Sequence, residues 1–268
     1  STYPLIIDTS GIVELILDNV NITTSNTATI IGLNAEEITI TLKEGTTNTL
    51  SDGGSSEYDG CIFSNANLIF NGTGTLIVNG LQEEGEGIAT EAKDITFNGG
   101  NYQITSNDDG INAGGDGATI TINDGSFYIN ASGDGIDSNK DAIINGGTIF
   151  VIGSDTGGDS GIDTDEGYTI NGGLVIALGS DMIETPKDTS TQNTLAFVLD
   201  NSISKDTIVS LLKDDELVVS FEAPKSFKTI IISTPELTND TYSIYTDGTN
   251  SGTLNNGIYS SGTYELGN

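Results

Sequence analysis

Several residue types are missing from this chain of 268 residues. It has no histidine and no tryptophan, and because its eight basic residues are all lysine it has no arginine. Without histidine, the Ser-His-Asp and Cys-His arrangements of nucleophilic hydrolases are excluded. The one cysteine, Cys61, excludes an internal disulfide and leaves the redox compartment open. No apolar run approaches the roughly 20 residues of a membrane-spanning helix, so we expect no membrane insertion.

Positive charge is also scarce. Aspartate and glutamate total 39 against 8 basic residues, which gives a formal net charge of -31. Binding to nucleic acid is therefore not expected, because it needs clustered cations, and an anionic membrane surface is disfavoured for the same reason. Calcium, in contrast, is a hard cation that prefers oxygen ligands, which are abundant here. Regular short runs of Ile, Val and Leu argue against disorder.

Two motifs alternate along the first two thirds of the chain. Asn71, Asn98, Asn123, Asn145 and Asn171 each end a short apolar run, at intervals of roughly 22 to 27 residues. Between them lie the acidic motifs "DGCI", "EGIA", "DGIN", "DGID" and "SGID". Each interval therefore holds about three strand-like runs separated by Gly and Asn, which is typical of the coils of a parallel β-helix. The recurring asparagines are interpreted as a ladder of amides along stacked turns.

Alternation of side chains assigns the faces of these strands. Before each Asn, we expect two inward columns, which contain Phe70, Phe97, Ile122, Ile144 and Ile170, and Leu68, Ile95, Ile120, Ala142 and Tyr168. After the glycines, Tyr102, Phe127, Ile149 and Val175 form a further inward column, followed by Ile104, Ile129, Val151 and Ala177. Cys61 is aligned with Ile88 and Ile111 in the acidic motif, so we interpret it as a buried small hydrophobic residue.

The motif spacing stops near Pro186, although strand-like runs continue. We therefore predict an all-β protein in two parts. Residues 1–186 form the coils of a parallel β-helix, and residues 187–268 form a β-rich C-terminal segment that caps the solenoid.

Stacking of the acidic motifs creates two columns of acidic side chains. We expect one column to contain Asp59, Glu86, Asp109, Asp134 and Asp181. We expect the other column to contain Asn112, Asp137, Asp163 and Glu184. Bare carboxylates about 4.8 Å apart repel by roughly 3 kcal/mol at an effective dielectric constant near 20. Either these side chains splay into solvent, or a divalent cation bridges them. We favour calcium, with two or more ions. The expected ligands are Asp108, Asp109, Asn112, Asp134, Asp137, Asp159 and Asp163, with Asp116 and Asp165 as outer candidates.

An outward stripe follows the glycines of the Asn motif, formed by Ile77, Gln103, Tyr128, Phe150 and Ile176. If it is exposed, it offers a sugar-binding ledge on which Gln103, Tyr128 and Phe150 make the contacts. The alternative is that a loop or the C-terminal segment covers it.

Catalysis by β-elimination would need a lysine base in this chain. Lys140 and Lys93 both follow an acidic motif, and Lys140 lies close in sequence to the expected calcium ligands. Neighbouring carboxylates favour the charged form of a lysine, which opposes a role as base. A charge-balancing turn lysine is therefore the favoured interpretation of Lys140.

Several segments of the chain together resemble a family of secreted bacterial carbohydrate-binding domains. These segments are "LDNVNITTS", "ITITLKEGTTNTLSDG", "DDGIN", "DGID", the "NGG" steps and "IIISTPELTNDTYSIYTDGT". The fold of that family is similar to the right-handed parallel β-helix of polysaccharide lyase family 9 and the pectate lyases. The resemblance implies bound calcium, at an acidic cluster similar to Asp108, Asp109 and Asn112 with Asp134 and Asp137 one coil later. It also implies binding of cellulose or acidic, pectin-like sugars. The catalytic lysine of those lyases has no matching position here.

We therefore expect a calcium-loaded, non-catalytic protein that binds plant cell-wall polysaccharide. We expect a monomer at the bacterial cell surface or secreted from the cell, with the signal peptide already absent from the chain. Two alternatives stay open. One is a calcium-dependent pectate-type lyase that uses Lys140, and the other is a structural or adhesive solenoid in which calcium joins the coils.

Overall fold

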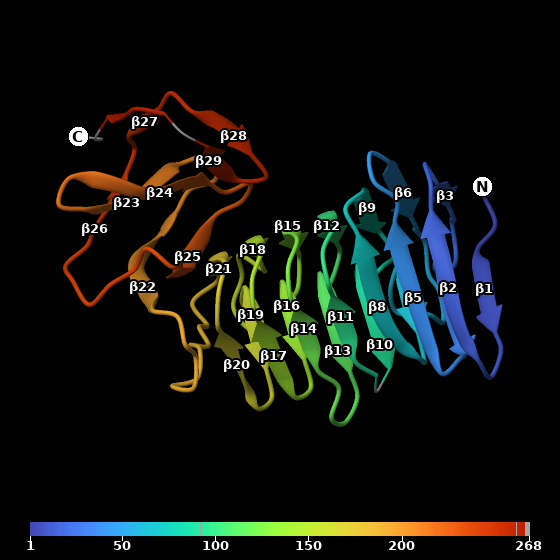
Figure 1. Ribbon diagram of the computed structural model, residues 1–268. Helices are drawn as coiled ribbons and strands as arrows, with labels where there is room; N and C mark the ends of the chain where they lie inside the picture. Colours follow the sequence, from blue (N-terminus) through green and yellow to red (C-terminus); the bar gives the residue numbers. More distant parts are fainter. Residues whose placement is uncertain (92, 261, 266–268) are drawn as a thin grey trace.

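The computed structural model describes residues 1–91, 93–260 and 262–265, and this part of the chain contains strands but no helix (Figure 1). Consequently, no helix in the described residues is long and apolar enough to cross a membrane. The strands wind into a solenoid of about seven turns, and each turn contributes one strand to each of three sheets. The prediction of an all-β parallel solenoid is confirmed.

Three parallel sheets form the solenoid. The first sheet contains β1 (Leu5–Asp8), β4 (Ile30–Asn34), β7 (Ile62–Ser64), β10 (Ile88–Glu91), β13 (Ile111–Gly114), β16 (Ile136–Ser138) and β19 (Ile162–Thr164). The second sheet contains β2 (Ile12–Leu17), β5 (Glu37–Leu42), β8 (Asn67–Gly72), β11 (Ile95–Phe97), β14 (Ile120–Ile122), β17 (Asp141–Ile144) and β20 (Gly167–Ile170). The parallel strands of the third sheet are β3 (Asn21–Thr23), β6 (Thr47–Ser51), β9 (Thr75–Gly80), β12 (Asn101–Ser106), β15 (Ser126–Ala131), β18 (Thr148–Ile152) and β21 (Leu174–Gly179).

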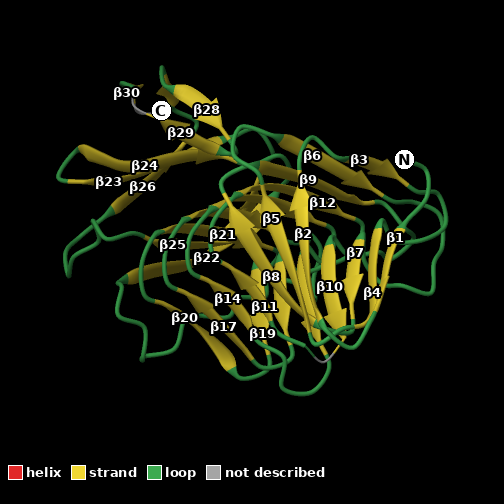
Figure 2. Ribbon diagram, turned by 45° about the vertical axis from the view of Figure 1, so that its right-hand side comes forward, coloured by secondary structure: helices red, strands yellow, loops and turns green. Residues whose placement is uncertain are grey.

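The C-terminal part continues one of these sheets and adds others. β25 (Phe227–Ser233) pairs antiparallel with β21, and β22 (Thr194–Ile203) pairs with β25. The C-terminal sheet contains β26 (Ser243–Thr246), β23 (Ile208–Lys213), β24 (Glu216–Glu222), β29 (Ile258–Ser260) and β28 (Thr253–Asn255), in that order. β27 (Thr249–Asn250) pairs with β30 (Tyr264–Glu265). Figure 2 shows the C-terminal sheet beside the third sheet.

The core of the solenoid consists of stacked columns of apolar side chains, one residue from each coil. The four inward columns predicted around the Asn motif are confirmed, because register pairs each member with its neighbour and all are buried. Phe70 and Phe97 stack with ring centroids 4.7 Å apart, as do Tyr102 and Phe127. Such aromatic pairs add about 0.5–1.5 kcal/mol beyond the area that they bury.

The recurring asparagines form a continuous amide ladder, as predicted. Nδ2 of Asn98 donates to Oδ1 of Asn71 at 2.9 Å, and Asn123, Asn145 and Asn171 each repeat this bond to the preceding coil at 2.8 to 3.0 Å. In these turns, the glycines after the asparagines adopt the left-handed backbone conformation, for example Gly147 at φ 92°. The ladder therefore fixes the register of neighbouring coils.

One predicted column is out of register by a single residue. Ile88 pairs with Ile62, so Cys61 corresponds to Gly87 and not to Ile88. The same shift places Gly60, and not Asp59, in line with Glu86. Cys61 is fully buried as expected, and burial raises the pKa of its thiol to about 12. "DGCI" has one residue more between its glycine and its isoleucine than "EGIA" and "DGIN" have, so its Asp-Gly pair lies one position earlier in the coil.

The C-terminal sheet covers part of the predicted outward stripe. The register of the third sheet aligns Ile77, Gln103, Tyr128, Phe150 and Ile176 as predicted. Phe150 and Ile176 are, however, fully buried in an apolar cluster with residues such as Phe221 and Ile232. The exposed ledge is therefore wrong for Phe150, and the alternative of a covering C-terminal segment holds there. Gln103 stays exposed and Tyr128 half-buried.

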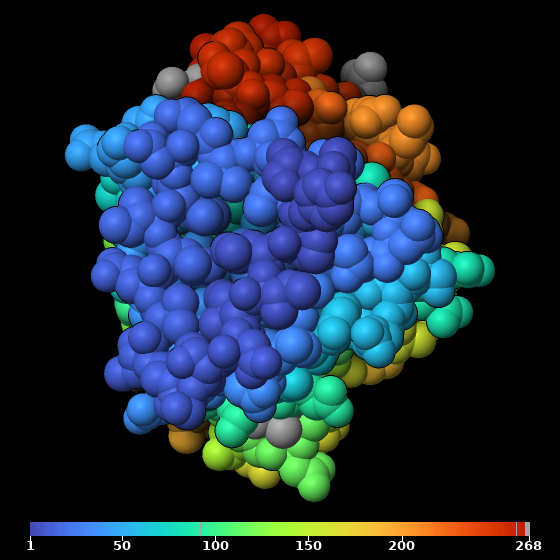
Figure 3. Space-filling view, turned by 90° about the vertical axis from the view of Figure 1, so that its right-hand side faces the viewer, coloured from blue at the N-terminus to red at the C-terminus, as the bar shows by residue number. Residues whose placement is uncertain are grey.

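Figure 3 looks onto the N-terminal end of the solenoid, which residues of the first coils form. Ile12 and Ile16 of β2 are 66% and 62% exposed there, and Ile6 of β1 is 56% exposed. The opposite end of the third sheet is extended by β25 and β22, so the two ends of the solenoid differ in what lies against them.

Candidate functional site

The acidic motifs bring their side chains together along the first sheet. Ile88, Ile111, Ile136 and Ile162 pair in register, so the residues two positions earlier, Glu86, Asp109, Asp134 and Ser160, lie in line on successive coils. On the outer face of the strands, Asn112 pairs with Asp137, and Asp137 pairs with Asp163. We call Glu86, Asp109, Asn112, Asp134, Asp137 and Asp163 the acidic cluster.

Hydrogen bonds join the two columns of the acidic cluster. Nδ2 of Asn112 donates to Oε1 of Glu86 at 2.6 Å and to Oδ2 of Asp109 at 3.0 Å. Oδ1 of Asp109 accepts from the backbone N–H of Asp134 at 2.7 Å, and Oδ1 of Asp134 accepts from the N–H of Ser160 at 2.5 Å. Asp109 and Asp134 therefore each lean toward the next coil, and the same contact occurs twice along the solenoid axis.

Four carboxylates of the cluster are held in an environment that opposes their ionisation. Burial, followed by the charges of neighbouring carboxylates, raises the pKa of Glu86 well above its usual range. Burial also raises the pKa of Asp109 to about 8, Asp134 to about 7 and Asp137 to about 6. The ion pairs that the described residues form, such as Lys187 with Asp141, involve none of these carboxylates. The cluster therefore lacks a cationic partner within the described chain.

Two features leave room for such a partner. Oδ1 of Asn112 is buried and has no hydrogen-bond partner within the described part of the chain. Gly133 lies against Oδ1 of both Asp108 and Asp109, and a side-chain carbon at this position would collide with both oxygens. As the side chains stand, no three carboxylates among the described residues converge into a ready-made cation site. The donor chemistry fits a hard cation, and binding one would require these side chains to turn inward.

The other predicted ligands lie at the edges of the acidic cluster. Asp108 and Asp159 are half-buried; burial raises the pKa of Asp108 and Asp134, and the charge of Asp159 adds to both shifts. Asp165 is exposed, and its charge contributes to the raised pKa of Asp137. Asp116 is exposed in the turn after β13 and contributes to none of the shifts in the cluster.

An open groove of about 410 Å³ adjoins the acidic cluster on the outer face of β7, β10 and β13. Its floor is apolar, with Phe63 and Ala89, and Tyr58 packs on Phe63 with ring centroids 5.4 Å apart. Carboxylates surround this floor, and Glu86 and Asn112 belong to both the groove and the cluster. We call this the acidic groove; its lining also includes Glu57, Asp59, Thr90 and Glu91.

The sequence-based ligand set omitted Glu86, although the motif "EGIA" occupies the same place in its coil as "DGIN" and "DGID". The apolar floor was also missed. Phe63 follows the isoleucine of the acidic motif directly, at the position that Ala89 and Asn112 hold in later coils. An aromatic residue at an outward position was the available signal.

Lys140 is half-buried in the turn between β16 and β17. Its backbone N–H donates to Oγ of Ser138, and its carbonyl accepts from the N–H of Glu166 at 2.7 Å. These contacts tie its backbone into the turn that follows Asp137.

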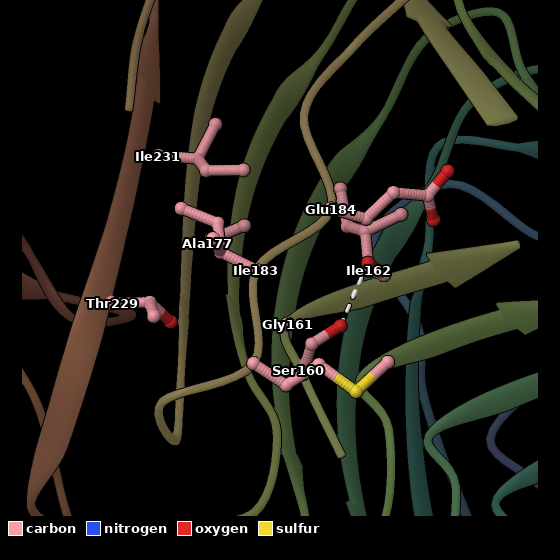
Figure 4. A pocket seen from close by; sticks show the side chains of 9 residues that line it. Ser160, Gly161, Ile162, Ala177, Ile183, Glu184, Thr229 and Ile231 are labelled. Atoms are coloured by element: carbon pink, nitrogen blue, oxygen red, sulfur yellow. Dashed lines mark hydrogen bonds between the residues drawn. The ribbon is translucent and has the colours of Figure 1, made fainter. Parts of the chain in front are cut away.

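Near the C-terminal end of the first sheet, a second cavity is too small for a sugar. It lies between Ile162, Ala177, Ile183 and Ile231 and holds about 10 Å³ (Figure 4). That volume is about the minimum for one water molecule. Beside it, Oγ of Ser160 donates to the carbonyl of Ile162 at 2.7 Å. This cavity is a packing feature of the last coil.

Comparisons with known proteins agree with this architecture. No curated protein matches the chain. Among solved structures, the chain is similar to a polysaccharide lyase-like protein from C. thermocellum, described as a gadolinium derivative. The two are 26% identical with a TM-score of 0.52, over 69% of this chain and 80% of that chain.

A family model also matches residues 3–263, nearly the whole length, and it is described as carbohydrate-binding domain-containing protein. The repeated coils, the groove with its apolar floor and polar rim, and this match all agree with polysaccharide binding in general. The chain belongs to the carbohydrate-binding domain-containing family.

Proposed function

We propose that the protein is a calcium-loaded, non-catalytic polysaccharide-binding protein that acts outside the cell on plant cell-wall polymers. Acidic, pectin-like chains would bind in the acidic groove. The observation that carries the proposal is the acidic cluster itself. It has several carboxylates of raised pKa and a buried amide oxygen without a partner, and it opens directly into the groove.

Calcium suits this donor set better than a transition metal does. The available donors are carboxylate and amide oxygens, which hard cations prefer, and the chain has no histidine. The ions would be held by the acidic cluster, which consists of Glu86, Asp109, Asn112, Asp134, Asp137 and Asp163. Asp108 and Asp159 would lie at the edge of the site. The related structure from C. thermocellum is a gadolinium derivative, and gadolinium is also a hard cation that prefers oxygen ligands.

The net charge of -31 supports a role for a cation in binding. A polyuronate would be repelled by the carboxylates that line the groove, such as Glu57 and Glu91. Calcium held by the acidic cluster would supply the positive charge that attracts substrate carboxylates. Phe63 and Ala89 form the floor of the groove but are only 8% and 3% exposed, so the polymer would be held mainly by the polar groups of the rim.

A retention assay on a polygalacturonate gel tests this proposal. With calcium, we expect the protein to be retained, and with a chelator we expect retention to fall at least tenfold, about 1.4 kcal/mol. The Glu86→Gln variant should lose affinity in calcium, because Glu86 belongs to both the cluster and the groove. Asp124→Asn is the matched control, since Asp124 is exposed in a turn between the second and third sheets.

Three results would contradict the proposal. Equal retention in calcium and in chelator, with the fold checked by circular dichroism, would remove the ions from the binding site. A loss of thermal stability on chelation without binding of any polysaccharide would favour a structural solenoid. A new ultraviolet-absorbing double bond in the bound polymer would instead support a lyase, and Lys140→Ala would then be the next variant to assay.

A further inference from the structure

Another cavity, separate from both the acidic groove and the small cavity beside Ser160, lies where the C-terminal sheet meets the third sheet. It measures about 320 Å³, and both parts of the chain contribute to its wall. The solenoid supplies Gln103 of β12 and Tyr128 of β15, whereas the C-terminal part supplies Glu222, Leu254 and Asn256 among others. We call this the junction cavity. It shares no lining residue with the acidic groove.

Tyr128 gives the junction cavity an aromatic wall. On one side its ring stacks on the buried ring of Phe150, with centroids 5.8 Å apart and an angle of 8° between the planes. On the other side its neighbour in the column is Gln103, and the cavity lies where Gln103 and Tyr128 meet. Gln103 already holds the next position of this column, so a sugar ring in the cavity would pack its apolar face on the accessible part of the Tyr128 ring beside Gln103.

Polar side chains lie around this aromatic wall and form hydrogen bonds with one another. Nε2 of Gln103 donates to Oδ1 of Asn256 at 3.2 Å, which joins the solenoid to the turn between β28 and β29. The hydroxyl of Tyr259 donates to Oε2 of Glu222 at 2.6 Å, and Glu222 itself lines the cavity. Amides both donate and accept, and carboxylates accept, so this set matches the hydroxyl groups of a sugar.

The C-terminal wall of the junction cavity is built rigidly. Asn256 and Gly257 have positive φ values of 47° and 79°, and a side-chain carbon at Gly257 would lie 2.6 Å from the ring of Phe150. The turn therefore packs directly on the solenoid. A smaller cavity of about 160 Å³, lined by Ser126 and Tyr259, also includes Asn256 in its wall. The two cavities meet at this residue, which favours a chain of sugar rings over a single ring.

The charges at the junction cavity select against an acidic sugar. Asp206 and Glu222 both line it. Lys205 lies 3.8 Å from Asp206 as an exposed ion pair, which contributes little in water. Nζ of Lys225, next to Pro224 in the wall, donates to the carbonyl of Ala131. A uronate would therefore meet uncompensated carboxylates here, whereas an uncharged sugar would not.

We propose that the junction cavity binds a neutral pyranose oligosaccharide, stacked on Tyr128 and hydrogen-bonded by Gln103 and Asn256, without a metal ion. This site goes beyond the calcium-dependent binding of acidic chains in the acidic groove. It gives one chain two carbohydrate sites of different chemistry, on different faces.

Isothermal titration calorimetry with cellohexaose, xylohexaose and mannohexaose, each in calcium and in chelator, tests this site. We expect at least one of them to bind equally in both conditions. Tyr128→Ala should weaken that binding roughly tenfold, because it removes the stacking surface. Tyr128→Phe keeps the ring and should stay within about twofold of the wild type. Tyr3→Ala, which changes a tyrosine that is 78% exposed at the N-terminal end, is the matched control.

Gln103→Ala provides a second variant in case Tyr128→Ala does not fold, because Gln103 is exposed and its loss leaves no buried gap. Its binding should also weaken. The proposal is overturned if none of the three oligosaccharides binds, or if Tyr128→Ala, or Gln103→Ala in its place, binds as tightly as the wild type. Oligogalacturonate titrated into the same proteins reports on the acidic groove separately, so failure of one site is distinguishable from failure of the other.

Discussion

The glycine that follows the acidic residue packs directly against the core in three of the motifs, at Gly87, Gly110 and Gly135. At Gly87, a side-chain carbon would lie 2.5 Å from Cγ2 of Ile104, and at Gly135 it would collide with Cγ2 of Val151. Neither glycine has a positive φ value, so space and not backbone conformation requires it. Glycine here lets the corner of each coil approach the third sheet, and this approach brings the acidic residues of neighbouring coils into line.

Gly135→Ala should destabilise the protein by about 1–3 kcal/mol, because the added methyl group overpacks the corner against Val151 and the carbonyl of Gly161. Denaturant unfolding followed by circular dichroism measures this difference. Gly53→Ala is the matched control, since a side-chain carbon at Gly53 meets no atom within 4 Å. Equal unfolding free energies for the two variants would contradict the packing argument.

At the scale of elements, the parallel strands of the first sheet place like charges side by side. Asp137 lies between Asn112 of the preceding coil and Asp163 of the following one, and the charge of Asp163 contributes to its raised pKa. Parallel pairing in register repeats the same position on every coil, so a repeated acidic motif becomes a column of carboxylates. The repulsion within that column is a cost of folding that a bound cation would offset.

Asp137→Asn should therefore have opposite effects in the two metal states. In chelator it removes one repelling charge, and we expect a gain on the order of 1 kcal/mol, which raises Tm by about 2–4 °C. In calcium it removes a ligand, so the increase in Tm that calcium gives to the wild type should become smaller. Scanning calorimetry of both states, with Asp124→Asn as the control, measures both effects. A lower Tm in chelator would contradict this account.

The raised pKa values also predict how stability depends on pH. In the folded, metal-free chain the pKa is about 8 for Asp109, about 7 for Asp134 and about 6 for Asp137, against 3.8 for an ordinary aspartate. The folded state therefore binds more protons than the unfolded state between pH 4 and pH 8. The contribution of these groups to stability is complete below about pH 4 and is lost as the pH rises through these folded-state values.

Thermal unfolding in chelator should accordingly show a Tm that falls from pH 5 to pH 8, and Asp109→Asn should flatten this slope. Calcium competes with protons for the same oxygens, so the increase in Tm caused by calcium should grow over the same range. A Tm that rises with pH in chelator, in the wild type and in Asp109→Asn alike, would show that other groups govern the dependence.

Much of the solenoid could be predicted because its signals are local and repeated. Alternation alone placed Phe97 and Tyr102 inward, and the asparagine spacing predicted the amide ladder. The burial of Phe150 could not be predicted this way, because its partner Phe221 is distant in sequence and belongs to a part without repeats. The right-handed winding and the calcium ions stay predictions.

At the scale of the whole molecule, the C-terminal sheet and the solenoid share one apolar interface. Phe150 lies at its centre, in contact with Tyr128 on the solenoid side and Phe221 on the other, with ring centroids 5.8 and 6.2 Å apart. The acidic groove lies on the first sheet and uses no residue of this interface. The two proposed sites therefore depend on different parts of the molecule.

Phe150→Ala should impair the junction cavity and leave the acidic groove able to bind. The lost packing costs about 3–5 kcal/mol, and it removes the surface on which Gly257 and Tyr128 rest. Hydrogen exchange should become faster in β23, β24 and β29, whereas β8 and β11 of the second sheet should keep their protection. Binding of neutral oligosaccharide should be lost, and calcium-dependent retention on polygalacturonate should persist.

Phe127→Ala is the matched control, since Phe127 is equally buried but lies in the core of the solenoid. Its loss should accelerate exchange in all three solenoid sheets, because the coils share one continuous core. If Phe150→Ala instead accelerated exchange uniformly, or abolished both kinds of binding, the C-terminal sheet and the solenoid would be a single cooperative unit. Both sites would then be lost at the same time, because unfolding of either part would also disrupt the acidic cluster.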